Sequence, residues 1–198
     1  MIAQRKIMKK LITFILLLTL TSSLFAQENK KEKRLGLFDK KTKSYMVGSG
    51  EDAIEISRVM TSCGKNPGFF QPFVPVKGVT PVTEADMLRA LNDKNIVVVD
   101  MRMSEQYLKE TIPTAMNIPY LEMELRLDEL GCKKEGKKWN CEKAVKVYGF
   151  CNGPVCAQSP IAMKAMVRNG FPADKIYYYR GGMLNWAALG LTTVEGEF

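Results

Sequence analysis

The stretch "AVKVYGFCNGPVCAQSPIAMKAMVRNG", residues 144–170, places two cysteines in a short loop between two apolar segments. Its first part is a short apolar run, which is typical of a buried strand. Its last part favours a helix, because Pro160 suits a first helical turn and Gly170 suits a C-terminal cap. Cys151 and Cys156 therefore lie at the two ends of a six-residue loop between a strand and a helix.

Strands and helices alternate along the chain on both sides of this loop. Thr83 and Asp86 form a capping-box pattern that predicts the start of a helix. The β-branched run at 95–100 is typical of a buried parallel strand. Further strands are predicted at 144–150 and 175–179, and helices at 83–91, 105–110, 120–131, 159–170 and 183–190. This order predicts an α/β fold with a central parallel sheet flanked by helices on both faces.

Three short motifs directly follow the three predicted strands. They are "DMR" at 100–102, "CNGPVC" at 151–156 and "RGG" at 180–182. In open parallel sheets, ligands bind at the carboxyl ends of the strands. We therefore expect the three motifs to meet in one pocket.

The loop that begins at Cys151 is suited to stabilise an anion. The backbone N–H groups of a tight turn point inward, and the N-terminus of the following helix adds about half a positive charge. Because a thiolate is an anion, this position predicts a lowered pKa and a nucleophilic role for Cys151. The substrate-binding loop would consist of Asn152, Gly153, Pro154, Val155, Cys156 and Ala157. The alternative is a buried cysteine that only ends a core strand.

The chain has 198 residues and no histidine. This length suffices for one domain with a sizeable core. The absence of histidine excludes a Ser-His-Asp triad, a Cys-His pair and the common zinc sites. Any nucleophilic cysteine must therefore be activated in another way, and we expect neither a bound metal nor a cofactor.

Several motifs together resemble a rhodanese domain over about residues 81–194. The stretches that carry the resemblance are 97–119, 150–156 and 175–191. The matching positions are Asp100, Arg102, the stretch from Ile112 to Pro119, Cys151, Gly181, Gly182, Trp186 and Gly190. The resemblance implies a sulfurtransferase. In that chemistry Cys151 takes sulfane sulfur from a donor such as thiosulfate or polysulfide, carries it as a persulfide, and passes it to a thiol or other nucleophile.

Two positions depart from the pattern of this family. Thr111 stands where the family often has histidine, and Cys156 stands where the loop often ends in arginine. The loop therefore lacks a cation for an anionic donor, which also disfavours a related cysteine-phosphatase activity. Arg180 is the nearest candidate for anion binding, and the alternative is a solvent-facing arginine. We interpret Asp100 and Arg102 as an ion pair that braces the pocket.

The N-terminal part of the chain is typical of an exported protein. Residues 1–26 have a basic start, a short apolar middle and a small-residue end, as a secretory signal peptide does. The alternative is an uncleaved anchor, although spanning a bilayer takes about 20 apolar residues. Cleavage lowers the formal net charge from +8 to +4, so we expect no nucleic-acid binding. These properties predict a periplasmic or secreted protein with no stable membrane insertion after cleavage. A partly flexible extension at 27–80 would precede the rhodanese-like domain at 81–198.

Export gives the five cysteines a further meaning, because disulfides persist in oxidising compartments. Cys132 and Cys141 flank a charged turn, and we predict that they form a structural disulfide. Cys156 has two interpretations. It is either a resolving thiol that attacks a modified Cys151 or a small buried residue. The role of Cys63 stays open.

Three functions are compatible with these observations. The first is an exported sulfurtransferase that takes sulfur from a small donor molecule or a persulfide-carrying protein and delivers it to a thiol acceptor. The second is a thiol–disulfide redox protein or sensor that uses Cys151 and Cys156. The third is a non-catalytic rhodanese-like binding module, suggested by the aromatic cluster of Phe69, Phe70 and Phe73 in the extension.

Overall fold

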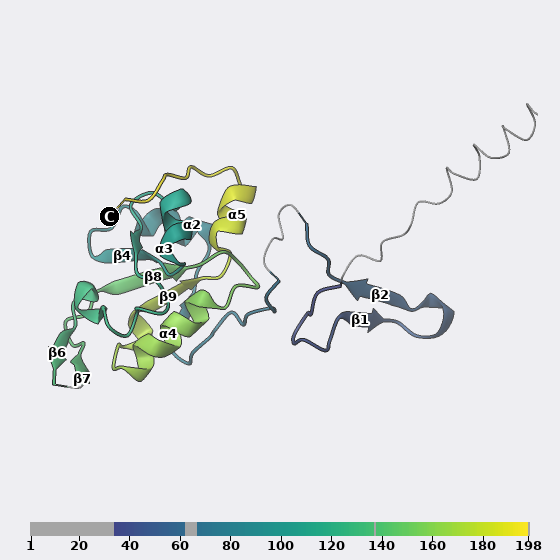
Figure 1. Ribbon diagram of the computed structural model, residues 1–198, viewed down its shortest axis with the longest axis horizontal. Helices are drawn as coiled ribbons and strands as arrows, with labels where there is room; N and C mark the ends of the chain where they lie inside the picture. The colour runs from purple at the N-terminus through teal and green to yellow at the C-terminus, as the bar shows by residue number, and fades with distance from the viewer. Residues whose placement is uncertain (1–33, 62–66, 137, 198) are drawn as a thin grey trace, which may run out of the picture. The chain divides into compact units, whose positions relative to one another are not determined.

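A five-stranded parallel sheet forms the centre of the computed structural model, which describes residues 34–61, 67–136 and 138–197 (Figure 1). The strand order is β3-β9-β8-β4-β5, and every neighbouring pair is parallel. The strands are β3 (Thr80–Pro81), β4 (Ile96–Asp100), β5 (Met116–Asn117), β8 (Lys146–Phe150) and β9 (Ile176–Tyr179). The predicted signal peptide at 1–26 and Cys63 lie outside the described residues.

Helices cover both faces of this sheet. Figure 1 shows α4 on one face and α2 and α5 on the other. The helices are α2 (Glu84–Ala90), α3 (Ser104–Lys109), α4 (Gln158–Arg168) and α5 (Gly182–Ala188), with short 3-10 helices η1 (Gly50–Asp52), η2 (Leu127–Leu130) and η3 (Ala173–Lys175). The predicted α/β fold with a central parallel sheet is confirmed. Within the described ranges, no helix has the length and apolar character needed to cross a membrane.

Successive side chains of the central strands pack alternately into two separate clusters of buried residues, one on each face of the sheet. Val99 of β4 lies in the cluster that contains Met163 of α4. Val98, its neighbour in sequence, lies in the opposite cluster with Phe150 of β8 and Trp186 of α5. Because side chains alternate along a strand and both faces are covered, the strands must be apolar almost throughout. This requirement explains the continuous apolar runs in the sequence.

The prediction of a helix at 120–131 is wrong. Only η2 is helical there, and turns precede it, such as the one in which the Leu125 N–H donates to the Glu122 carbonyl oxygen at 2.8 Å. Leu121 and Leu125 are 63% and 64% exposed, whereas the leucines of η2 are buried. The apolar residues at helical spacing therefore serve two different surfaces. A single helix would place these leucines on one face and bury them together, which is not what the structure shows.

A small antiparallel hairpin, β6 (Lys133–Glu135) and β7 (Lys138–Asn140), occupies the predicted charged turn. Gly136 at its tip has a φ of 63°, which glycine adopts without steric strain. Cys132 and Cys141 flank the hairpin, with their Cα atoms 4.1 Å apart and their sulfur atoms at disulfide distance. The fold thus brings the two cysteines to the positions that the predicted disulfide requires.

The extension contains a second antiparallel hairpin, β1 (Ser44–Val47) and β2 (Ile54–Ser57), and a following segment that contacts the domain. In that segment, the Gln71 N–H donates to the Pro154 carbonyl oxygen at 2.8 Å. Arg180 Nε donates to the Gln71 carbonyl oxygen at 2.7 Å. Gln71 of the extension is therefore fixed both to the loop that follows β8 and to Arg180, which follows β9.

Candidate active site

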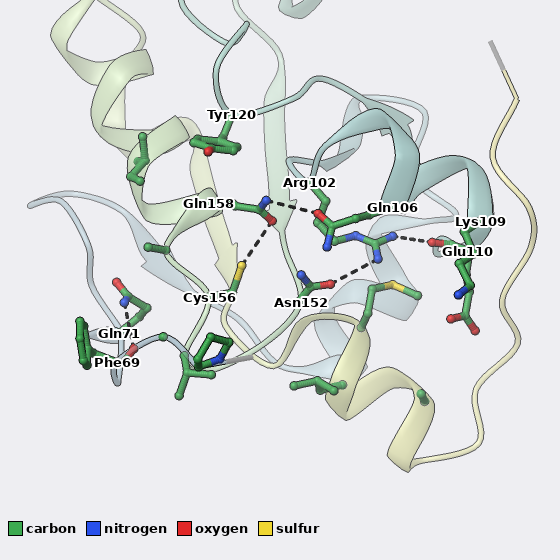
Figure 2. A pocket seen from close by; sticks show the side chains of 18 of the residues that line it. Phe69, Gln71, Arg102, Gln106, Lys109, Glu110, Tyr120, Asn152, Cys156 and Gln158 are labelled. Atoms are coloured by element: carbon green, nitrogen blue, oxygen red, sulfur yellow. Dashed lines mark hydrogen bonds between the residues drawn. The ribbon is translucent and has the colours of Figure 1, made fainter. Parts of the chain in front are cut away.

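A cavity of about 1100 Å³ lies at the carboxyl ends of the parallel strands. Figure 2 shows Arg102, Asn152, Cys156 and Gln158 around it. The "DMR" and "CNGPVC" motifs both contribute to its wall, and the start of α5 adds Met183. The cavity therefore lies where parallel α/β sheets bind their ligands. Two of the three motifs line it, as expected, whereas no residue of the third motif at 180–182 does, so the expectation that all three meet in the pocket is wrong for that motif.

The third motif brings α5 against the cysteine loop. The Met183 N–H donates to the Cys151 carbonyl oxygen at 3.0 Å, and the Leu184 N–H donates to the Asn152 carbonyl oxygen at 2.9 Å. Gly182 has a φ of 57°, and a Cβ at this position would lie 2.2 Å from the Cys151 carbonyl oxygen. Only glycine permits this backbone approach.

A buried ion pair between Asp100 and Arg102 supports one wall of the cavity. Arg102 Nε and Nη2 donate to the two carboxylate oxygens of Asp100 at 2.9 and 2.6 Å. Thr111 Oγ1 donates to the same carboxylate at 2.8 Å. Arg102 also donates to the Glu110 carbonyl oxygen and, at 3.4 Å, to Asn152 Oδ1. The predicted ion pair is confirmed, and it fixes a positive charge beside the cysteine loop.

Cys151 lies beneath the loop and is 1% exposed. Its thiol donates to the Cys156 carbonyl oxygen at 3.4 Å. Burial raises the pKa of Cys151 well above its ordinary value, and the neighbouring Cys156 thiol raises it further. The hydroxyl and N–H of Ser159 act in the opposite direction, with a smaller effect. The prediction of a lowered pKa at Cys151 is therefore wrong, because this thiol has little solvent around it and a second sulfur beside it.

Cys156 lies in the cavity wall, with its sulfur 3.4 Å from Gln158 Oε1. Its pKa is lowered to about 6, first because the Cys151 thiol hydrogen-bonds to it. The backbone N–H groups of Gln158 and Asn152 and the charge of Arg102 add to this lowering, against the opposing effect of burial. The loop thus stabilises a thiolate, as expected from the sequence, but the thiolate is that of Cys156.

Two glutamines of the wall were not predicted from the sequence. Gln158 Nε2 donates to Gln106 Oε1 at 3.2 Å and so joins the start of α4 to α3 (Figure 2). Gln106 lies only four residues after Arg102, in the helix that follows the "DMR" motif, and this closeness in sequence could have marked it as a residue of the site. No sequence pattern marks Gln158, because its role depends on the side chain that faces it.

Arg180 contacts the extension and is not a cavity residue. Its Nε donates to the Gln71 carbonyl oxygen at 2.7 Å, and its guanidinium lies 4.5 Å from the centroid of the Phe73 ring. The sequence offered anion binding or solvent exposure as interpretations. The contacts show a third role, in which Arg180 holds the extension through a hydrogen bond and a cation–π contact.

The three phenylalanines of the extension do not form one surface. Phe69 lines the cavity. Phe70 packs edge-to-face on Phe38, with ring centroids 5.8 Å apart. Phe73 is 64% exposed and lies under the guanidinium of Arg180. Only Phe69 therefore contributes directly to the candidate site.

These properties define an α/β domain with a cysteine loop at the end of the middle strand of its parallel sheet. Residues 83–189 match the rhodanese-like domain family. The chain belongs to this family, and the match includes the "DMR" motif, the cysteine loop and all of α5.

Individual relatives share parts of this chain. It is 30% identical over 115 residues to the HTH-type transcriptional regulator Rv0324 of Mycobacterium tuberculosis, an alignment that covers 58% of this chain and 45% of the regulator. A thiosulfate sulfurtransferase structure from Pseudomonas aeruginosa is 21% identical, with a TM-score of 0.48, over 60% of this chain and 21% of that one. The BH2092 protein structure from Bacillus halodurans is 22% identical, with a TM-score of 0.45, over 59% of this chain and 75% of that one. This chain thus spans less than half of the regulator.

Proposed function

We propose that this protein is a sulfurtransferase in which Cys151 carries sulfane sulfur as a persulfide. The sulfur would come from a small donor or a persulfide-carrying protein and pass to a thiol or other nucleophile. The observation that carries the proposal is the pair of free thiols, Cys151 and Cys156, at the end of β8 beside the cavity. Membership of the rhodanese-like domain family supports the same chemistry.

The cavity wall favours a donor with an organic body over thiosulfate. Phe69 and Tyr120 give the wall apolar surface that an organic persulfide can cover. The guanidinium of Arg102 is already paired with Asp100, and Lys109 adds a single further cation to the wall. Thiosulfate carries two negative charges, so this wall neutralises it poorly.

We also propose that the protein is exported to the periplasm or secreted. The signal-like pattern of residues 1–26 supports this location. The placement of Cys132 and Cys141 at disulfide distance supports it independently, because disulfides form and persist in oxidising compartments.

A sulfur-transfer assay on the purified chain tests the proposed function. The protein is incubated with thiosulfate, inorganic polysulfide or glutathione persulfide, with cyanide or a thiol as acceptor. We expect a mass increase of about 32 Da, one sulfur atom, on the tryptic peptide 147–164, and faster turnover from the persulfide than from thiosulfate. If no donor leaves sulfur on Cys151 or Cys156, the protein is not a sulfurtransferase.

The contact between the two thiols favours thiol–disulfide exchange as a second candidate function. A thiolate at Cys156 next to the Cys151 thiol is the arrangement from which an internal disulfide forms. Mild oxidation by oxidised glutathione tests it, because a disulfide lowers the mass of peptide 147–164 by about 2 Da. A protein that keeps both thiols free under these conditions does not have this function.

A further inference from the structure

The cavity reaches Cys156 and not Cys151. Both thiols are buried, at 1% exposure for Cys151 and 2% for Cys156, but only Cys156 is part of the cavity wall. The two thiols are in hydrogen-bond contact with each other. A donor in the cavity therefore meets the Cys156 sulfur first.

The surroundings of Cys156 also suit an attacking thiolate. The Cys151 thiol and the N–H groups of Gln158 and Asn152 act on its sulfur, together with the positive charge of Arg102. A sulfur in this setting is deprotonated and nucleophilic at neutral pH. The Cys151 thiol, in contrast, stays protonated at neutral pH, because burial raises its pKa.

Two hydroxyl groups near Cys151 are buried without a hydrogen-bond partner among the described residues. They are Ser159 Oγ, in the first turn of α4, and Tyr178 Oη, on β9. Ser159 lies against the Cys151 sulfur, where its hydroxyl and N–H favour the thiolate. Burial raises the pKa of Tyr178, and the charges of Cys151 and Cys156 raise it further against the opposing charge of Arg180, so the Tyr178 hydroxyl lies near both sulfurs. Buried hydroxyls usually have partners, so these two are available as donors to an anion that forms on Cys151.

We propose that sulfur enters the protein on Cys156 and is then passed inward to Cys151, where the Ser159 and Tyr178 hydroxyls hold the persulfide away from solvent. This inference rests on the proposed sulfurtransferase function and specifies the order in which the two cysteines act. It also assigns a storage role to the two buried hydroxyls of Ser159 and Tyr178.

Each step of this relay is a sulfur transfer without net oxidation. First, the Cys156 thiolate attacks the outer sulfur of an organic persulfide, a new sulfur–sulfur bond forms, and the donor's own sulfur–sulfur bond breaks. The donor leaves as a thiolate and takes the proton of the transferred sulfur, so that Cys156 carries an anionic persulfide. Next, the Cys151 sulfur attacks the outer sulfur on Cys156, and the Cys156–sulfur bond breaks. The proton that Cys151 loses ends on the Cys156 sulfur, and the persulfide on Cys151 is an anion that can accept hydrogen bonds from Ser159 and Tyr178.

The alternative is attack of Cys151 on the inner sulfur of the Cys156 persulfide. That reaction forms a Cys151–Cys156 disulfide and releases sulfide. A disulfide is neutral and would leave the hydroxyls of Ser159 and Tyr178 without an anionic partner. The unpaired hydroxyls therefore favour the relay.

A time course on the wild-type chain tests the order of the two cysteines. Reduced protein is mixed with one equivalent of glutathione persulfide, quenched with an alkylating reagent at successive times, and digested with trypsin. Both cysteines lie in peptide 147–164, so fragment ions that separate Cys151 from Cys156 locate the added sulfur. We expect the adduct first on Cys156 and later on Cys151, with no release of sulfide.

Variants at the two cysteines test the same order without time resolution. Cys156→Ser and Cys156→Ala should slow the loading of Cys151 by roughly tenfold or more, because the remaining thiol is protonated and buried. Cys151→Ser should load Cys156 and keep the sulfur there. Circular dichroism confirms that each variant is folded.

Removal of the two hydroxyls tests the storage role. Ser159→Ala and Tyr178→Phe should each shorten the lifetime of the Cys151 persulfide toward cyanide by roughly tenfold, as expected for a lost hydrogen bond to an anion. Tyr178→Phe should not lower stability, because the Tyr178 hydroxyl has no hydrogen-bond partner among the described residues. Tyr148→Phe is the matched control, since Tyr148 packs against the opposite core cluster.

The outcomes separate the relay from the function on which it rests. Equal loading of Cys151 in the wild type and both Cys156 variants would overturn the relay and leave the sulfurtransferase intact. Release of one equivalent of sulfide together with formation of a Cys151–Cys156 disulfide would also overturn the relay. It would show that Cys151 attacks the inner sulfur and that the transferred sulfur is reduced to sulfide. A wild-type protein that takes up no sulfur on either cysteine contradicts the proposed function itself.

Discussion

Arg102 binds both carboxylate oxygens of Asp100 at the end of β4, and the two side chains are almost completely buried. The same guanidinium reaches Asn152 in the cysteine loop and lowers the pKa of Cys156 through its charge. One ion pair thus supports the cavity wall and tunes a thiol 54 positions further along the chain.

Replacement of Arg102 by methionine is expected to lower the free energy of unfolding by about 3–5 kcal/mol. The physical reason is that the Asp100 carboxylate would remain buried without its counter-charge. Urea unfolding followed by the fluorescence of Trp186, which is buried, measures the change. The double variant Asp100→Asn with Arg102→Met should lose less, because it removes both charges.

Arg89→Met is the control for this measurement. Arg89 pairs with Asp86 on the surface of α2, with its side chain 76% exposed. Exposed pairs contribute about 0–1 kcal/mol, so this variant should unfold almost as the wild type does. An equal decrease in the free energy of unfolding in the Arg89 and Arg102 variants would contradict a stabilising role for the buried ion pair.

Alkylation by iodoacetamide should distinguish the two free thiols by pH. The thiolate is the reactive form, so labelling of Cys156 should rise as the pH increases through about 6 and level off above it. Cys151 should resist labelling at neutral pH, since burial raises its pKa. Peptide mapping at each pH measures both rates.

The variant Cys151→Ala tests the cause of the low pKa of Cys156. The midpoint for labelling of Cys156 should move upward in this variant, because it removes the largest cause of the lowered pKa. A wild-type midpoint near 8.5, the usual thiol value, would refute the lowered pKa.

Loss of the Arg180 side chain should release the extension from the domain. Arg180→Ala removes the hydrogen bond to the Gln71 carbonyl oxygen and the contact with Phe73, together about 1–2 kcal/mol. Hydrogen–deuterium exchange of the Gln71 amide, which is bonded to Pro154, should become faster. Arg168→Ala, which removes a largely exposed partner of Glu124, should leave that exchange unchanged. Slow exchange in both variants would mean that Arg180 does not hold the segment.

The double variant Cys132→Ala with Cys141→Ala should lower the free energy of unfolding by about 2–3 kcal/mol, because a bridge across a short loop restricts the unfolded chain. Urea unfolding of the double variant and of reduced wild-type protein should give the same value. Alkylation of the native protein without reductant gives an independent check. Labelling of both cysteines under those conditions would show that the disulfide is absent.

Much of the fold could be predicted because burial leaves a periodic trace in the sequence. The strand at 95–100 could be predicted because both of its faces are covered. The helix before it, α2, could be predicted from the capping residues Thr83 and Asp86 at its N-terminus. The helix predicted at 120–131 failed because its leucines are divided between the core and the solvent. The spacing of leucines along the sequence does not distinguish those that are buried in the core from those that are exposed to solvent.

The sequence by itself determined the class of the fold, the family, and the presence of two thiols in one loop after the middle strand. Only the tertiary structure decided which thiol faces the cavity. Both thiols are buried, but only Cys156 lines the cavity, and burial raises the pKa of Cys151 while neighbouring donors lower the pKa of Cys156. Arg180 illustrates the same limit, since its partners Gln71 and Phe73 lie more than a hundred positions away. Such differences arise from contacts between distant segments, and local spacing does not encode them.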